Sequence, residues 1–148
     1  MFKKSKGLLV SLIVVAAILP VLIIGALSED LKLRTFADQE PVLRIWTEPD
    51  SVVTKPGKSF FVSVYGEIEN VNLVIPMVEF NFKSDNNLKT IPNAISYDKS
   101  FTGRVKLGEV NVTVSNTGEF NLDIPETGVN TKLPDLRIIT SGLKVLSR

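Results

Sequence analysis

The side chains that could do chemistry in this chain are few in kind. The sequence has no histidine and no cysteine, which removes the usual general base, the Ser-His-Asp triad, thiolate chemistry, disulfides and the common zinc sites. Its 16 acidic residues are scattered along the chain, and no spacing nominates two facing carboxylates of the kind that hydrolyse glycosides. We therefore expect no enzyme activity, no catalytic residue, no metal site and no cofactor.

Three aromatic side chains could instead form a binding surface. Trp46, Phe61 and Tyr65 alternate with apolar residues that would point to a core, so they fall on the outer side of their strands. Outward aromatic rings on one sheet face can stack against the apolar face of sugar rings. The alternative is that a loop or the preceding segment covers them, or that Trp46 is core, because large aromatics are mostly buried. We predict Trp46, Phe61 and Tyr65 as ligand-binding residues, for an extracellular glycan or protein ligand.

Two polar motifs have simpler explanations. Asp85-Asn86-Asn87 is rich in oxygen atoms but lacks the spacing of a calcium loop, and such clusters more often form turns. Asn111-Val112-Thr113 is an acceptor sequence for N-glycosylation. In a host without that modification, these are ordinary outward residues of a strand.

The N-terminus predicts export. Residues 7–27 carry no charge, and a helix of this length, at about 1.5 Å per residue, crosses the roughly 30 Å hydrocarbon core of a bilayer. Lysines precede this run and two acidic residues follow it, so the positive-inside rule places the N-terminus in the cytoplasm. We predict a signal-anchor helix over residues 1–28 that contacts the lipid bilayer through residues 7–27. The protein would then be a single-pass protein of the cell membrane, with its C-terminal domain extracellular.

Two other fates of this segment stay open. A secretory signal has an apolar region of about 7–15 residues, so this longer run favours a retained anchor. Ala26-Leu27-Ser28 nevertheless offers small residues to a signal peptidase, and cleavage near Ser28 would give a secreted protein. A prepilin-type leader would be cut after Gly7, but the glutamate usual in such leaders is replaced by Leu12.

The exported part has no charge bias. Without the three lysines ahead of residue 7, the 17 basic residues fall to 14 against 16 acidic ones, a net charge of −2. Binding to phosphate backbones needs clustered lysine and arginine, so we expect no nucleic-acid partner.

From Val42 onward the apolar residues alternate with period two, which predicts β-strands. The strongest stretches are 60–65, 78–83, 110–115 and 120–124, and weaker ones are 42–47, 71–75, 104–107, 136–140 and 143–146. Asn116-Thr117-Gly118, between two alternating stretches, predicts a hairpin. We therefore predict an all-β fold over residues 42–148, an antiparallel β-sandwich, behind a short stalk over residues 29–41. Its core would contain Phe60, Val62, Val64, Val78, Phe80, Val112, Leu122 and Ile124.

Residues 47–88 resemble the opening of a cohesin-type domain, a β-sandwich related to carbohydrate-binding modules. Such domains have a short strand followed by a V-x-x-G-x-x-F-x-V-x-V segment, and residues 53–64 (VTKPGKSFFVSV) have this shape. A strand and a Y-D-P-x-x-L corner follow in the family. Residues 78–88 correspond to them without the Tyr and Pro, and residues 95–101 (ISYDKSF) match the corner residues later in the chain. The resemblance covers about half of the exported part. It implies an antiparallel β-sandwich of the Ig-like or cohesin-like jelly-roll type, similar to carbohydrate-binding modules, with a role in recognition.

These observations favour a membrane-anchored, extracytoplasmic, non-catalytic binding or adhesion module of the cell envelope. The alternative is a structural or accessory subunit of a surface assembly, pilin-like in its N-terminal helix. A small hydrolase is the third and least favoured hypothesis, since no pair of catalytic groups is nominated.

Overall fold

Strands account for most of the domain, as the alternation predicts. The computed structural model describes residues 40–69 and 72–148, and Glu40–Arg148 form one compact unit. Its strands, in order, are β1 (Val42–Glu48), β2 (Ser51–Thr54), β3 (Ser59–Glu69), β4 (Val78–Asn81), β5 (Lys83–Ser84), β6 (Leu88–Ile91), β7 (Ala94–Tyr97), β8 (Arg104–Val114), β9 (Gly118–Asp123), β10 (Arg137–Ser141) and β11 (Leu143–Ser147). One turn of 3-10 helix, η1 (Glu126–Gly128), follows β9.

The predicted membrane helix over residues 7–27 lies outside the described residues, as does the stalk up to residue 39, so both stay predictions. In the ranges that the structure does describe, no helix has the length and apolarity needed to cross a bilayer.

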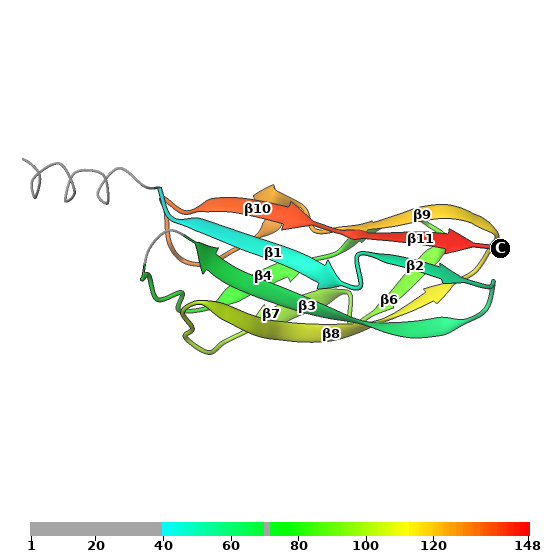
Figure 1. Ribbon diagram of the computed structural model, residues 1–148, viewed down its shortest axis with the longest axis horizontal. Coiled ribbons are helices and arrows are strands. Elements are labelled where there is room, and N and C mark those ends of the chain that lie inside the picture. Colours follow the sequence, from blue (N-terminus) through cyan, green and yellow to red (C-terminus); the bar gives the residue numbers. More distant parts are fainter. Residues whose placement is uncertain (1–39, 70–71) are drawn as a thin grey trace, which may run out of the picture. The chain divides into compact units, whose positions relative to one another are not determined.

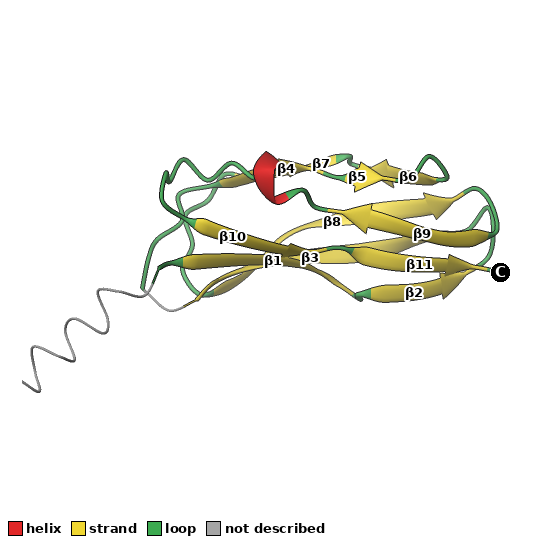
Figure 2. Ribbon diagram, turned by 90° about the horizontal axis from the view of Figure 1, so that it is seen from above, coloured by secondary structure: helices red, strands yellow, loops and turns green. Residues whose placement is uncertain are grey.

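Two layers of strands enclose the core (Figures 1 and 2). One layer is a five-stranded sheet in the order β10-β1-β3-β8-β6. The other layer combines the four-stranded sheet β2-β11-β9-β5 with the two-stranded sheet β4-β7. Figure 1 shows β1, β3 and β8 running beside one another, with β4 and β7 behind them. The prediction of an all-β sandwich is confirmed.

The sequence predicted an antiparallel sandwich, and this part of the prediction is wrong, because two pairs of strands are parallel. The chain's first strands run parallel to its last, β1 beside β10 and β2 beside β11. Both pairs change sheet together: β1 passes to β2 around Pro49, and β10 passes to β11 at Gly142. A Cβ atom at Gly142 would collide with the carbonyl oxygen of Leu122, so this crossing of the two layers requires glycine.

The core consists of two clusters of buried side chains, one toward each end of the domain. Phe82 packs against both clusters and links them. Seven of the eight predicted core residues are buried, namely Val62, Val64, Val78, Phe80, Val112, Leu122 and Ile124. The eighth, Phe60, is half-buried at the edge of one cluster.

The predicted hairpin at residues 116–118 is wrong. β8 and β9 are consecutive, but β8 pairs with β3 and β6, whereas β9 pairs with β11 and β5. Both strands have one apolar row, and the two rows face each other across the core instead of lying side by side in one sheet. The turn is therefore a connection between layers.

The predicted strand over residues 71–75 is also wrong. Residues 72–74 have no strand conformation, and only Ile75 forms an isolated bridge, with Phe101. In contrast, β2, β6 and β7 are strands that the alternation did not mark, because their sequences (SVVT, LKTI and AISY) do not alternate apolar and polar residues.

Candidate binding surface

The three predicted ligand-binding residues lie on one surface, the outward face of the five-stranded sheet, which we call the outer face. Trp46 is on β1, and Phe61 and Tyr65 are on β3, all on the side opposite buried neighbours such as Ile45 and Val64. β1 and β3 are adjacent, and Trp46 is the direct partner of Tyr65 in their register. The predicted facing of these side chains is confirmed, while their role in ligand binding stays a prediction.

Trp46 and Tyr65 belong to an organised group that we call the Trp46 cluster, completed by Arg104 and Glu48. The two rings stack, with centroids 5.9 Å apart and an interplanar angle of 24°. The guanidinium carbon of Arg104 lies 5.2 Å from the Trp46 ring centroid and 4.7 Å from that of Tyr65. Glu48 accepts hydrogen bonds from the Arg104 guanidinium at 2.7 Å and from Trp46 Nε1 at 3.0 Å. Each member of the cluster therefore restricts the conformation of the others.

Phe61 is not part of that cluster. It lies four residues from Tyr65 on the same strand, about 13 Å away at the usual rise of a strand. Its direct partner on β8 is Asn111, whose partner on β6 is Ile91. Phe61 is 65% exposed and Ile91 is 61% exposed. We call Phe61, Asn111 and Ile91 the Asn111 strip.

Two further ion pairs lie on the outer face. Arg44 donates to both carboxylate oxygens of Glu69, at 2.8 and 3.3 Å, and Lys106 donates to Glu109 at 2.7 Å. The hydrogen bond to Glu69 raises the pKa of Arg44 above its ordinary value, and the hydrogen bond to Glu109 does the same to the pKa of Lys106. These pairs are exposed, so they contribute little to stability.

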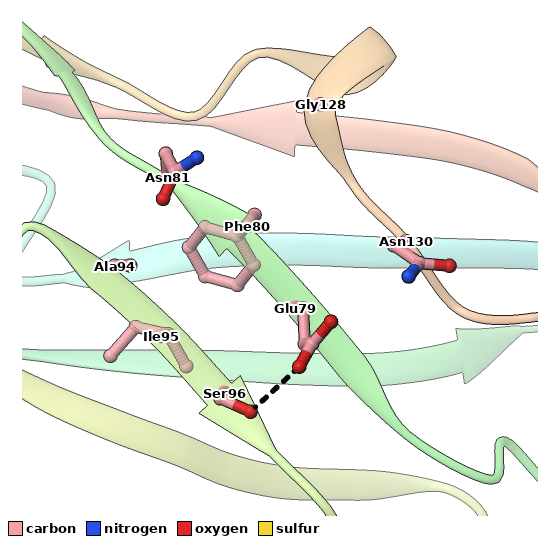
Figure 3. A pocket seen from close by; sticks show the side chains of 8 residues that line it. All are labelled: Glu79, Phe80, Asn81, Ala94, Ile95, Ser96, Gly128 and Asn130. Carbon is pink, nitrogen blue, oxygen red and sulfur yellow. Dashed lines mark hydrogen bonds between the residues drawn. The ribbon is translucent and has the colours of Figure 1, made fainter.

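A shallow hollow of about 310 Å³ opens on the opposite layer, over β4 and β7 (Figure 3). Its floor includes Phe80 and Ile95, and Glu79 at its rim accepts a hydrogen bond of 3.1 Å from Ser96. Glu79 is the one ionisable residue among the lining residues. A single carboxylate without a second acid or base opposite it does not make a hydrolytic site.

The oxygen-rich motif at residues 85–87 makes hydrogen bonds to neighbouring segments of the chain. Asp85 accepts the backbone N–H of Asn121 at 2.9 Å, and Asn87 accepts a hydrogen bond of 2.8 Å from Asn116. Among residues 40–69 and 72–148, no three acidic side chains lie close enough to hold a metal ion.

Three members of these groups, Glu48, Arg104 and Ile91, were not predicted from the sequence. Arg104 and Ile91 were missed because they reach the aromatic residues only through strand pairing, β3 with β8 and β8 with β6. The sequence contains one hint: Arg104 begins the weakly alternating stretch 104–107, in a position that would point outward. That signal does not say which strand lies alongside.

Comparison with known proteins identifies the fold. No protein-family model and no curated protein sequence matches the chain. Among solved structures, a non-cellulosomal cohesin from the hyperthermophilic archaeon Archaeoglobus fulgidus superimposes with a TM-score of 0.50 and 11% identity, over 74% of this chain and 92% of the cohesin. The domain has a cohesin-like fold. The third ScaB cohesin of R. flavefaciens, in complex with a group 1 dockerin, matches with a TM-score of 0.47 and 14% identity, over 76% of this chain and 99% of that one.

The resemblance noted in the sequence is therefore confirmed at the level of the cohesin-like fold. The glycine turn that carried part of it is present: Gly57 has a φ of 78°, and its N–H bonds to the carbonyl of Val114 at 2.7 Å. At this level of identity, the shared fold by itself does not transfer a ligand or a partner.

Proposed function

We propose that residues 40–148 of this cohesin-like domain are an extracytoplasmic, non-catalytic binding module that recognises a protein, held at the membrane by residues 7–27. The observation that carries the proposal is the Trp46 cluster on the outer face. Trp, Tyr and Arg are the residue types most enriched at the energetic centres of protein interfaces. Here residues of all three types are held together on an open sheet face.

The cluster is arranged before any partner arrives. Stacking, the hydrogen bond from Trp46 to Glu48 and the Arg104–Glu48 ion pair fix these side chains in the free domain. Binding therefore costs little additional side-chain entropy, which is the usual advantage of a preorganised surface. Because the ion pair is about half exposed on both sides, it contributes little to the stability of the free domain and can be shared with a partner's charged group.

A protein fits this surface better than a glycan. A sugar that stacks on Trp46 or Tyr65 needs a free ring face, but the guanidinium of Arg104 lies over both rings. The sugar would have to displace a charged group that is bonded to Glu48. A protein partner can instead pack around the cluster and leave these contacts in place.

The partner can be sought by photocrosslinking on the surface of cells that make the protein. A photoreactive residue at Ser63 on β3, beside the cluster, should capture a partner, whereas the same residue at Lys144 on β11, in the other sheet, should not. The captured protein is then purified and titrated against the domain and its variants. We expect Arg104→Ala to weaken binding at least tenfold and Lys144→Ala to leave it unchanged. Equal capture at both positions, or equal affinity of both variants, would contradict the proposal.

The glycan alternative has a separate readout. A panel of envelope polysaccharides is titrated against the same domain while Trp46 fluorescence is recorded. The chain has one tryptophan, so a sugar that stacks on the Trp46 cluster must change that emission. A saturable change that disappears in Tyr65→Ala would replace the protein ligand by a glycan.

The membrane tether rests on the charges that flank residues 7–27. Protease added outside intact cells or spheroplasts should digest residues 29–148, while a tag ahead of Lys3 should remain protected. A C-terminal reporter that is active only in the cytoplasm would refute the orientation, and with it every extracellular role. Mass spectrometry of the mature N-terminus separates a retained anchor from cleavage near Ser28.

A further inference from the structure

Asn111 lies on the outer face between two exposed apolar side chains. It sits on β8 between buried Val110 and Val112 and faces outward. Its direct partners on the two neighbouring strands are Phe61 and Ile91. Directly opposed residues in antiparallel strands have Cβ atoms only about 5 Å apart, so an apolar side chain stands on each side of the Asn111 amide.

These two side chains lack an explanation within the domain. Phe61 and Ile91 are two of the four large apolar residues that are more than half exposed in the described part of the chain. Large apolar side chains grouped on an exposed sheet face favour aggregation and usually mark a covered surface. Something is therefore expected to cover them in the mature protein.

The sequence around Asn111 identifies the cover. Asn111-Val112-Thr113 has the form Asn-x-Thr, and no other asparagine of the chain is followed two residues later by serine or threonine. This is the acceptor sequence for N-linked glycosylation of exported proteins. We propose that Asn111 carries an N-linked glycan in the exported protein, and that its first sugars pack against the side chains of Phe61 and Ile91.

The chemistry is a glycosyl transfer from a lipid-pyrophosphate-linked oligosaccharide, the class of donor used on exported chains. The amide nitrogen of Asn111 forms a bond to the anomeric carbon of the first sugar. The bond from that carbon to the lipid pyrophosphate breaks, the pyrophosphate leaves as an anion, and the amide loses one proton. No oxidant or reductant is required.

The position of Asn111 sets the order of events. β8 is paired on both sides, with β3 and with β6, and the Thr113 hydroxyl lies 2.7 Å from that of Ser59 on β3. A transferase that needs Asn111 and Thr113 on a free segment must therefore act before these strands pair, during export. After folding, the apolar faces of the sugars pack on the Phe61 ring, as sugars do on aromatic side chains, and remove apolar surface from water.

This inference rests on the export proposed above. It also narrows the surface left for a protein partner. A glycan on the Asn111 strip covers one end of the outer face, while the Trp46 cluster, about 13 Å further along β3, stays open.

The test produces the full chain in a yeast that N-glycosylates secreted proteins, and compares intact masses before and after peptide N-glycosidase. We expect one glycan, absent in Asn111→Gln and in Thr113→Val. Removing the glycan should lower the Tm of the natural chain by a few degrees. In the double variant Phe61→Ser/Ile91→Thr, which keeps the acceptor sequence, removal should leave Tm nearly unchanged. The enzyme converts Asn111 to aspartate in both the natural chain and the double variant, so the added charge cancels in this comparison.

A matched control is Val53→Thr on β2 in the other sheet, since Val53 is 61% exposed. This variant should keep the full Tm difference. A protein that protease digestion shows to be exported, yet carries no glycan at Asn111, would overturn this inference and leave the proposed function intact. If removal of the glycan changes Tm equally in the double variant, the sugars do not pack on Phe61 and Ile91. Accumulation of the domain in the cytoplasm would refute the proposed function, and this inference with it.

Discussion

The two ends of the outer face present aromatic side chains to solvent in opposite ways. In the Trp46 cluster, neighbouring strands supply a second ring, a guanidinium and a carboxylate, and the aromatic rings are only partly exposed. In the Asn111 strip, the neighbouring strands supply an amide and an aliphatic side chain, and Phe61 remains 65% exposed. Both ends involve β3 and β8, but β1 completes the Trp46 cluster whereas β6 completes the Asn111 strip, so the difference comes from the residues that neighbouring strands place beside each ring.

This difference separates two roles that an alternating pattern cannot distinguish. An outward aromatic residue whose neighbours carry complementary polar groups is integrated into the domain, and it presents a rigid surface to a partner. An outward aromatic residue with apolar neighbours stabilises nothing in the bare domain and needs a cover. The following predictions test whether the two ends differ in this way.

The largest difference in stability should appear when one aromatic ring is removed from each end in separate variants. Trp46→Thr loses the stack, the contact with Arg104 and the bond to Glu48, so it should lower the free energy of unfolding by about 2–3 kcal/mol. Phe61→Thr keeps a residue with high strand propensity and loses few contacts, so it should change that free energy by less than about 0.5 kcal/mol. Urea unfolding of the unglycosylated domain measures both. Equal effects would mean that the two ends do not differ.

A smaller effect should follow from removing the charge above the rings. Arg104→Met keeps an apolar stem but loses two cation–π contacts and an exposed ion pair, at a cost of about 1–2 kcal/mol. Arg104→Lys should recover part of this, because an ammonium group also interacts with ring faces. The emission of Trp46 should change in Arg104→Met and stay unchanged in Phe61→Thr. An unchanged emission in Arg104→Met would show that Arg104 does not lie over the rings in solution.

The sequence correctly predicts which side of its strand a residue lies on, but it does not predict which strands lie beside one another. The two ends of the outer face show why. Alternation within a strand depends on local residues, so Trp46, Phe61 and Tyr65 were assigned correctly to the outer side. Register depends on pairing between distant segments: Glu48 and Arg104, which form an ion pair, are 56 residues apart. Ile91 was missed because the apolar residues of β6, Leu88 and Ile91, are three positions apart and so do not alternate with polar ones.

The prediction of a hairpin between β8 and β9 was wrong for a related reason. Two amphipathic strands joined by Asn116-Thr117-Gly118 can pair in one sheet or face each other across a core, and their apolar rows are identical in both arrangements. The outcome depends on which other strands compete for each edge. Here β3 and β6 take both edges of β8, while β11 and β5 take those of β9, and no local pattern contains that information.

The smallest effect concerns Lys106, whose strand partner is Tyr65 of the Trp46 cluster. Its hydrogen bond to Glu109 raises the pKa of the Lys106 ammonium above the ordinary value. A raised pKa in the folded state means that the pair stabilises the domain fully below the pKa of an unfolded lysine. That contribution is lost as the pH rises through the folded-state pKa, so it disappears only in the alkaline range. NMR titration of the lysine side chains should show the raised pKa, and Glu109→Gln should bring it back toward the ordinary value. The control Glu119→Gln, on β9 in the other sheet, should leave the pKa of Lys106 unchanged. If Glu109→Gln also leaves it unchanged, the pair does not form in solution, and the polar order of this end is confined to Arg104 and Glu48.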